Sequence, residues 1–247
     1  MKLTLSRFIA ILLVVFWVSS GMRSPVNAQE AGHEHDAGSS MEMHHMHLMM
    51  NHGLAMVAEG SNLVMLAEMK MSPDLDPVAL NHGRSMMEEG KEMIQHMLSG
   101  PEMEAMHKSG HGNAPLMVYT HSLAKAMLDY VDMLQNMKMG EMKPEDTMTM
   151  HHMHILINHA MEMAAEGSKL VMIGQMEMAK DMDRHSVEHG RKMLTEAREL
   201  IKEVMEGKAM SAMHTRQTGS SSEMAYTHNL AKAATDLLDL MEKMPGA

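Results

Sequence analysis

Apolar residues recur along most of this chain at the three- and four-residue spacing of an α-helix, and strand-like alternation is absent. This pattern predicts helices over residues 41–70, 77–99 and 116–138, with a short turn over 102–107. Ser72-Pro73-Asp74 and Gly100-Pro101 supply the stop signals between them. Ala, Leu, Met, Glu and Lys dominate the same stretches, as helices prefer. The chain is therefore expected to be all-α.

The sequence aligns with itself, without a gap, at a shift of 107 residues, so the chain contains an internal repeat. HHMH occurs at 44–47 and 151–154, AEGS at 58–61 and 165–168, and YTH at 119–121 and 226–228. More than 40% of residues 44–137 are identical to residues 151–244. We therefore predict a helical bundle built from two tandem three-helix repeats, residues 41–138 and 147–244, joined by a linker over 139–146.

Residues 1–28 have the layout of a secretory signal peptide. Lys2 and Arg7 flank an apolar run over residues 8–18, and small residues precede Gln29. A run of this length is too short to cross a hydrocarbon core of about 30 Å comfortably, so we expect export and cleavage; an uncleaved anchor is the alternative. Residues 29–40, with His33 and His35, are expected to be a disordered tail. The predicted location is the periplasm or the exterior.

The composition of the chain disfavours some classes of binding partner and favours others. Without residues 1–28 the chain carries 18 basic and 32 acidic residues, a formal charge of −14, and only three aromatic residues, all Tyr. Such a chain repels nucleic acid and anionic membranes and attracts cations. It contains no Cys, 39 Met and 19 His in total. Exported proteins lacking thiols keep thioethers and imidazoles as durable soft ligands.

His and Met recur together at helical spacing. Of the 26 His and Met residues in 44–137, 17 are repeated at the matching position, against fewer than two fifths of the other residues. A His and a Met one helical turn apart can chelate a single soft ion such as Cu(I), with Ag(I) and Cu(II) as other candidates. The predicted metal ligands are the HHMH clusters and these His–Met pairs: His44, His45, Met46, His47, His52, Met56, His82, Met86, Met103, His107, Met117, His121, His151, His152, Met153, His154, His159, Met163, His189, Met193, Met210, His214, Met224 and His228.

The first two helices are expected to form an antiparallel hairpin about Met56 and Met86, which would bring His52 towards Glu89 and His82 towards Glu59. A carboxylate beside an imidazole fixes its tautomer in many metal sites. Gly60, Gly90 and Gly167 each weaken a helix by about 1 kcal/mol, and close helix approach would explain their presence.

On its export signal, its helical His–Met pairs, its HHMH clusters and its lack of Cys, the chain resembles the periplasmic Met/His-rich copper- and silver-binding proteins of bacterial metal resistance. The resemblance is compositional and covers most of residues 41–228. It implies sequestration, buffering or handover of Cu(I) or Ag(I) without catalysis, and a copper or silver efflux or delivery protein as partner.

Other classes stay open at this point. Met-rich helices also suit a periplasmic chaperone or a metal sensor, because Met packs adaptably against varied partners. Non-covalent haem held by one His and one Met is a further alternative. A ferritin-like di-metal enzyme needs Glu-x-x-His, which Glu104 and His107 provide, but Ser211 replaces the carboxylate before His214. The favoured interpretation is a protein without enzymatic activity.

Overall fold

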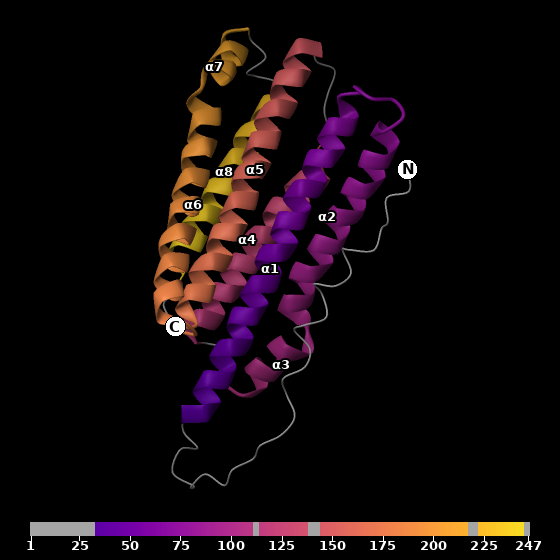
Figure 1. Cartoon of the computed structure of the whole chain (residues 1–247). Helices are drawn as coiled ribbons and strands as arrows, with labels where there is room; N and C mark the ends of the chain where they lie inside the picture. Colours follow the sequence, from indigo (N-terminus) through magenta and orange to yellow (C-terminus); the bar gives the residue numbers. More distant parts are fainter. Residues whose placement is uncertain (1–32, 111–113, 138–143, 217–221, 245–247) are drawn as a thin grey trace, which may run out of the picture. The chain divides into compact units, whose positions relative to one another are not determined.

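The computed structural model describes residues 33–110, 114–137, 144–216 and 222–244, and within them every regular element is an α-helix. The all-α prediction is confirmed. The chain divides into two compact units, residues 1–36 and 37–247, and only His33–Asp36 of the first unit is described. Predictions about residues 1–28 fall outside the described residues. The helices, labelled in Figure 1, are α1 (His33–Glu68), α2 (Asp76–Ser99), α3 (Pro101–Lys108), α4 (Pro115–Gln135), α5 (Pro144–Gln175), α6 (Lys180–Glu206), α7 (Lys208–Thr215) and α8 (Ser222–Glu242).

Helix ends follow the stop signals in the sequence. After α1, Lys70 takes a left-handed conformation with φ of 53°, and Ser72-Pro73 leads into α2, whose first turn carries Pro77. Gly100 is extended, with φ of −75° and ψ of 170°, which breaks the helix immediately before Pro101 opens α3. Pro fits the first turn of a helix because its missing N–H has no partner there.

Three boundaries differ from expectation. The backbone is helical from His33, so residues 33–40 of the segment expected to be disordered extend α1; no proline lies between Pro25 and the end of that helix to stop it, and residues 29–32 lie outside the described part. α5 begins at Pro144, three residues before the expected start of the second repeat. The expected turn over 102–107 is a full two-turn helix, α3, because Pro101 and two acidic residues in its first turn favour a helix N-terminus.

The two halves of the chain form the same elements. The bounds of α7 and α8 equal those of α3 and α4 displaced by 107 residues. α2 and α6 likewise end at matching residues, Ser99 and Glu206. The sequence duplication is therefore expressed in the helices themselves.

α1 and α2 pack backbone to backbone through glycines. A Cβ on Gly60 would lie 2.5 Å from the carbonyl O of Gly83, and a Cβ on Gly90 would lie 2.4 Å from that of Gly53. These contacts set the antiparallel register expected about Met56 and Met86. In α5 and α6, Gly167 meets Gly190 in the same way, at 2.7 Å. Close helix approach is confirmed as the reason for Gly60, Gly90 and Gly167.

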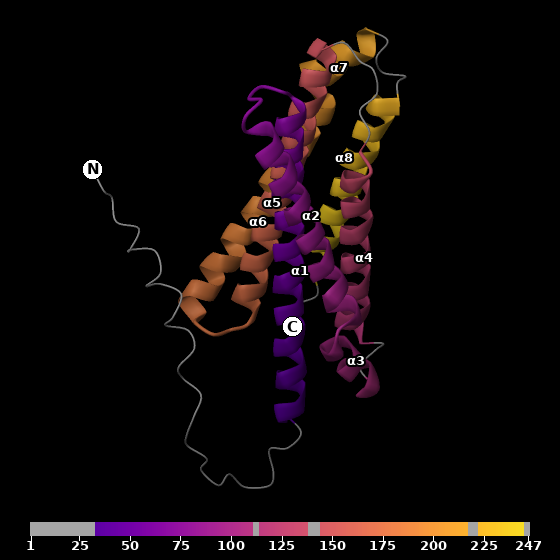
Figure 2. The ribbon, with the colours of Figure 1, turned by 90° about the vertical axis from the view of Figure 1, so that its right-hand side faces the viewer.

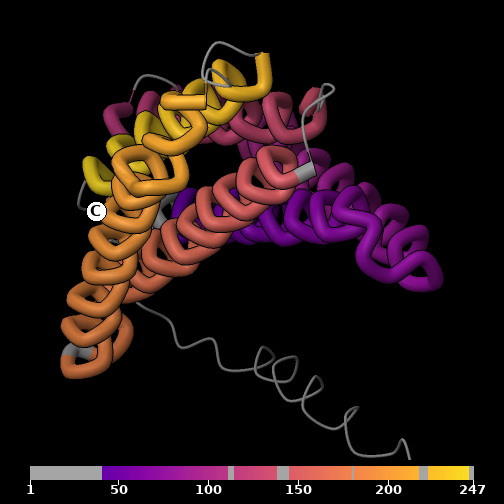
Figure 3. Tube along the Cα trace, turned by 90° about the horizontal axis from the view of Figure 1, so that it is seen from above, coloured from indigo at the N-terminus to yellow at the C-terminus, as the bar shows by residue number. Residues whose placement is uncertain are grey.

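The two hairpins share one core. Buried residues of α1, α2 and α4 form a continuous apolar cluster with buried residues of α5, α6 and α8. Figures 1 and 3 show the two hairpins with α4 and α8 packed along them. The Asn51 side chain donates to Ser168 Oγ at 3.1 Å, and Asn158 donates to Asn62 at 3.1 Å, so α1 and α5 run antiparallel. Figure 2 accordingly places α3 and α7 at opposite ends.

None of the helices within the described residues is both long enough and apolar enough to span a membrane.

Candidate metal centres

Five methionines from three helices are buried together at one end of the first half. Met43 and Met46 lie three apart on α1, Met103 and Met106 lie three apart on α3, and Met117 lies on α4. Each is at most 4% exposed. The three-residue spacing puts both sulfurs of a helix on one face. The break at Gly100 turns α3 so that its face meets the other two helices. We call this set the first methionine cluster.

The second half repeats the arrangement. The residues displaced by 107, which we call the second methionine cluster, are Met150, Met153, Met210, Met213 and Met224, and each is likewise at most 4% exposed. Here the methionines are continuous with the main core. Ten methionines are thus buried at equivalent positions of the two halves.

A buried imidazole adjoins each cluster. His47 is fully buried, and its Nε2 lies 2.6 Å from Thr120 Oγ1. The Thr120 hydroxyl has a single proton, and its other two neighbours, the Leu116 carbonyl O at 2.8 Å and Met43 Sδ at 3.3 Å, are both acceptors. The arrangement that makes the most hydrogen bonds has Thr120 donating to the Leu116 carbonyl and His47 Nε2 donating to Thr120, and this tautomer leaves Nδ1 without a proton. Within the part of the chain that the structure describes, Nδ1 has no hydrogen-bond partner.

His154 has the same geometry in the second half. Its Nε2 lies 2.7 Å from Thr227 Oγ1, and that hydroxyl donates to the Glu223 carbonyl O at 3.0 Å. His154 Nδ1 is again buried with no partner among the described residues. The same tautomer, with a bare Nδ1, is therefore fixed twice.

Both imidazoles are neutral at ordinary pH. Burial, assisted by the neighbouring His44, lowers the pKa of His47 to about 4. Burial, assisted by His151, lowers the pKa of His154 to about 4 as well. Each bare nitrogen is therefore an available Lewis base and does not compete with protons until the solution is distinctly acidic.

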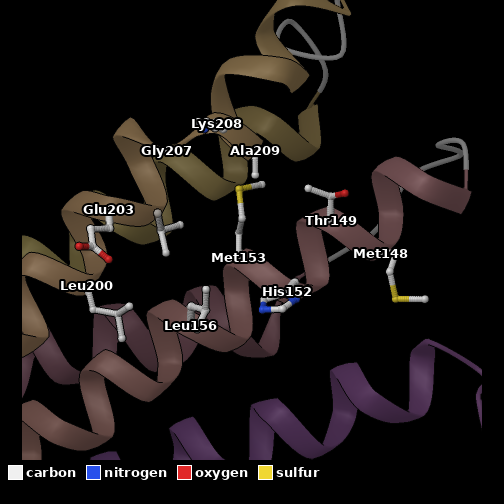
Figure 4. A pocket seen from close by; sticks show the side chains of 11 residues that line it. Met148, Thr149, His152, Met153, Leu156, Leu200, Glu203, Gly207, Lys208 and Ala209 are labelled. Carbon is white, nitrogen blue, oxygen red and sulfur yellow. The ribbon is translucent and has the colours of Figure 1, made fainter.

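A solvent-accessible pocket reaches each cluster. One pocket of about 430 Å³ lies between α5, α6 and α7 and is lined by Met148, His152, Met153 and Glu203 among others. Figure 4 shows the Met153 side chain extending from α5 towards the junction at Gly207–Ala209, with the His152 ring at the pocket edge. Because Met153 also belongs to the second methionine cluster, the pocket and the cluster meet at this residue.

The first half has a corresponding pocket of about 370 Å³. Its lining includes His45 and Met46, the counterparts of His152 and Met153, together with Met41, Met97 and Met176. Met176 follows α5, so the second half contributes to the pocket of the first. Four thioethers and an imidazole therefore surround this opening.

The predicted ligands at the middle of the hairpins do not gather in a buried site. His52, His82, His159 and His189 are exposed, and Met56, Met86, Met163 and Met193 are only half-buried. Glu89 accepts a hydrogen bond from Ser85 on its own helix at 2.7 Å, and not from His52. These residues lie on hairpin faces because the glycines occupy the contact between the helices.

The His–Met pairs near α3 and α4 separate in space. Met103 and Met117 turn into the first methionine cluster, while His107 is exposed and His121 half-buried. The His107 and His121 rings lie 5.2 Å apart. Met210 and Met224 are buried in the same way, and His214 and His228 are again 5.2 Å apart. The predicted His–Met pairs are therefore not formed: the methionines of these helices are buried, and the histidines lie beside each other nearer the surface.

Of the HHMH clusters, His44, Met46, His47, His151, Met153 and His154 are buried, and only His45 and His152 face solvent. The predicted ligands did not include Met43, Met106, Met150 and Met213, which complete the methionine clusters. Their signal was present: each recurs at the 107-residue shift and lies three residues from a predicted ligand.

The described residues hold no group of three or more His, Asp or Glu side chains arranged to bind a metal ion. Comparisons with protein-family models, with curated proteins and with solved structures found no match.

Proposed function

We propose that this protein binds soft monovalent metal ions, Cu(I) foremost and Ag(I) by the same chemistry, in its two methionine clusters. One observation carries the proposal: in each half five methionines are buried, and the histidine that directly follows one of them, His47 after Met46 and His154 after Met153, is buried with an Nδ1 that has no partner among the described residues. A buried polar atom without a partner costs about 1–3 kcal/mol, so such atoms are rare unless something fills the place.

The ligand set favours soft ions over hard ones. Thioether sulfur stays unprotonated and binds Cu(I), whereas Mg, Ca and Mn prefer oxygen ligands. Neutral imidazole adds a stronger donor without adding charge. A purely structural role for the methionines would explain their packing, but not the buried, unpartnered Nδ1 atoms of His47 and His154.

Access is provided by the two pockets. His45 and His152 stand at the openings, and Met46 and Met153 connect the openings to the clusters. The negative formal charge of the chain raises the local concentration of cations. We infer that ions are captured at the exposed imidazole and then pass inward to the thioethers.

The function supported by these sites is sequestration, buffering or handover of Cu(I) or Ag(I) by an exported, non-enzymatic protein of metal homeostasis or resistance. Its architecture is two tandem three-helix repeats, each with a short extra helix, that share one core. A copper or silver efflux or delivery protein is the expected partner. Export rests on the sequence of residues 1–28 alone.

The test is an anaerobic titration of residues 29–247 with Cu(I) against a competing chromophoric chelator. The informative variant carries Met43→Leu, Met103→Leu and Met117→Leu, since Met-to-Leu swaps in a core usually cost less than about 1.5 kcal/mol each. The matched control replaces three exposed methionines, Met71, Met178 and Met182, which are 67–73% exposed.

We expect the wild type and the control to retain the same number of Cu(I) ions, and the cluster variant to lose those of the first cluster with unchanged helical circular dichroism. Excess Zn(II) should not displace the bound Cu(I). Equal retention by the cluster variant and the control would show that the methionines are only packing residues.

A further inference from the structure

Two histidine pairs outside the methionine clusters have a geometry of their own. His107 on α3 and His121 on α4 have ring centroids 5.2 Å apart, with planes inclined by 59°. His214 on α7 and His228 on α8 have centroids 5.2 Å apart, inclined by 38°. The same separation in two different stretches of chain marks a feature of the repeat.

The rings are accessible from solvent. His107 and His214 are exposed, and His121 and His228 are half-buried. No apolar core holds these rings together, because the methionines of the same helices turn inward and leave the imidazoles at the surface. An ion can therefore reach them directly.

The tautomer of His121 is fixed for binding. Its Nδ1 lies 2.9 Å from the carbonyl O of Met117, one turn earlier on α4. A carbonyl can only accept, so Nδ1 carries the proton and Nε2 keeps a free lone pair. A backbone carbonyl that orients a ring nitrogen in this way is a common second partner of metal-binding histidines.

The separation of the rings suits a shared ion. With a metal–nitrogen bond of about 2.0–2.1 Å, two imidazoles on one ion place their ring centroids roughly 4.5 Å apart at the right angle that Cu(II) prefers and roughly 5 Å apart at the tetrahedral angle that Zn(II) prefers. Two imidazoles completed by water suit borderline divalent ions, and of these Cu(II) binds most tightly. A carboxylate is not part of the shared pattern, because Glu104 in the first half is replaced by Ser211 in the second.

We propose that each histidine pair binds one borderline divalent transition-metal ion, Cu(II) in preference to Zn(II), at a surface site distinct from the methionine clusters. Together with the proposed Cu(I) function, the histidine pairs would give the protein two kinds of copper site: Cu(II) on imidazole pairs outside and Cu(I) on thioethers inside. This inference does not depend on the proposed Cu(I) function, since it uses none of the methionine sulfurs.

The experiment measures Cu(II) bound to the purified protein by electron paramagnetic resonance, with competition against a chelator of known affinity. The variants are His107→Ala, His214→Ala and the double variant. The matched control is His96→Ala, an exposed histidine on α2 that is not one of the predicted ligands and has no ring partner among the described residues. Cu(I) capacity is titrated anaerobically on the same samples.

We expect the wild type to bind two Cu(II) ions per chain with nitrogen hyperfine coupling from two imidazoles each. Each single variant should lose one of these signals, the double variant both, and the control neither. Any Cu(II) signal from the histidines at 33 and 35 should be the same in all variants. The double variant therefore gives the size of this background signal, which is subtracted from the others. Retention of both two-nitrogen signals in the double variant would overturn the inference.

A second measurement uses the unaltered protein, so that its result does not depend on whether a variant folds. Nitrogen-15 spectra of the unaltered protein should show His121 protonated at Nδ1, and added Zn(II) should shift the Nε2 resonances of His107 and His121 together. Shifts confined to other histidines would contradict the site. Absence of Cu(I) binding by the wild type would instead contradict the methionine clusters alone, so the two failures are distinguishable.

Discussion

At the scale of single residues, the informative groups are His47 and His154. Each is buried, each donates through Nε2 to a threonine, and each is left with a bare Nδ1. An imidazole kept only for structure would normally use both nitrogens, because an unpartnered buried atom weakens the fold. We therefore interpret the two residues as preformed ligands whose apo state is less stable than it could be.

The substitution His47→Leu tests this interpretation. Since it removes an unpartnered buried nitrogen, we expect the free energy of unfolding of the apo protein to fall by no more than about 1 kcal/mol, although the Thr120 contact is lost. Cu(I) affinity of the first cluster should fall at least tenfold. Urea unfolding measures the free energy of unfolding, and chelator competition measures the Cu(I) affinity.

The control is His52→Leu, at an exposed site of the same helix, which should change neither quantity. A large loss of apo stability with unchanged Cu(I) binding in His47→Leu would assign His47 a structural role.

The lowered pKa values make apo stability depend on pH. In the unfolded chain these histidines take up protons near pH 6.5, whereas in the folded protein they do so only near pH 4. The unfolded state therefore binds more protons between these values, and stability falls as pH drops from about 6.5 to about 4. Each histidine contributes about 3 kcal/mol to that loss.

Urea unfolding of the apo protein at a series of pH values between 7 and 4 checks this expectation. The variant with both His47→Leu and His154→Leu should show a clearly flatter dependence over this range. An equally steep dependence in that variant would mean that other groups, such as carboxylates, control the acid response.

At the scale of elements, the helical hairpins are set by glycine. Gly60 and Gly83 bring the backbones of α1 and α2 so close that a Cβ on either would meet the opposite carbonyl at 2.4–2.5 Å. Backbone atoms cannot move aside as a side chain can. Because α1 continues from this hairpin into the first methionine cluster, the glycine contact also positions Met43 and Met46, which lie several turns away.

Gly60→Ala should therefore destabilise the fold, although alanine favours a helix over glycine by about 1 kcal/mol. Forcing the helices apart costs about 1–3 kcal/mol, as overpacking in a core usually does. We expect a net decrease in the unfolding free energy, measured by urea titration. Ser85→Ala on the exposed face of α2 should be near neutral. A stabilised Gly60→Ala protein would show that the hairpin is looser than the glycine contacts indicate.

At the scale of the whole molecule, the antiparallel pairing of α1 and α5 separates the two methionine clusters. Asn51 lies opposite Ser168 and Asn62 opposite Asn158, so Met46 and Met153 are about twenty residues apart along the shared helix direction. At 1.5 Å per residue this is roughly 30 Å. Sites so far apart, with no shared ligand, are expected to act independently.

If the two methionine clusters act independently, their Cu(I) capacities should add. The Leu variants of the first cluster and of the corresponding second-cluster residues, Met150, Met210 and Met224, should each lose their own share of Cu(I), and the combined variant should lose the sum. Anaerobic titration of the four proteins gives the comparison. Cluster variants that each abolish all binding would mean that the ions are held jointly, between the halves.

Much of the fold could be predicted from the sequence because its signals are local. Helix ends follow Pro73, Gly100 and Pro101, and the duplication is visible by simple comparison. Gly60 and Gly90 indicated the hairpin because glycine destabilises the interior of a helix, so its presence there points to a close contact with another helix. The predicted start of α1 was wrong because polar composition alone suggested disorder, although nothing in residues 33–40 stops a helix.

The candidate site was predicted less well. The sequence supplied the ligand types, the HHMH clusters and the position of Met103 and Met117, but its spacing grouped His with Met along each helix. The structure groups Met43 with Met103 and Met117, and His107 with His121. Helical spacing places a residue on a face of its own helix; it carries no information about which face of another helix that residue will meet.

That this chain is helical, duplicated, acidic, rich in Met and His and free of Cys could be established without coordinates, since composition and periodicity are properties of the chain alone. Three features came from the packed molecule: α3 turns back at Gly100, the methionines converge from three helices, and Thr120 and Thr227 leave one imidazole nitrogen bare in each half. These features depend on the angles at which helices meet, and packing of the entire core sets those angles.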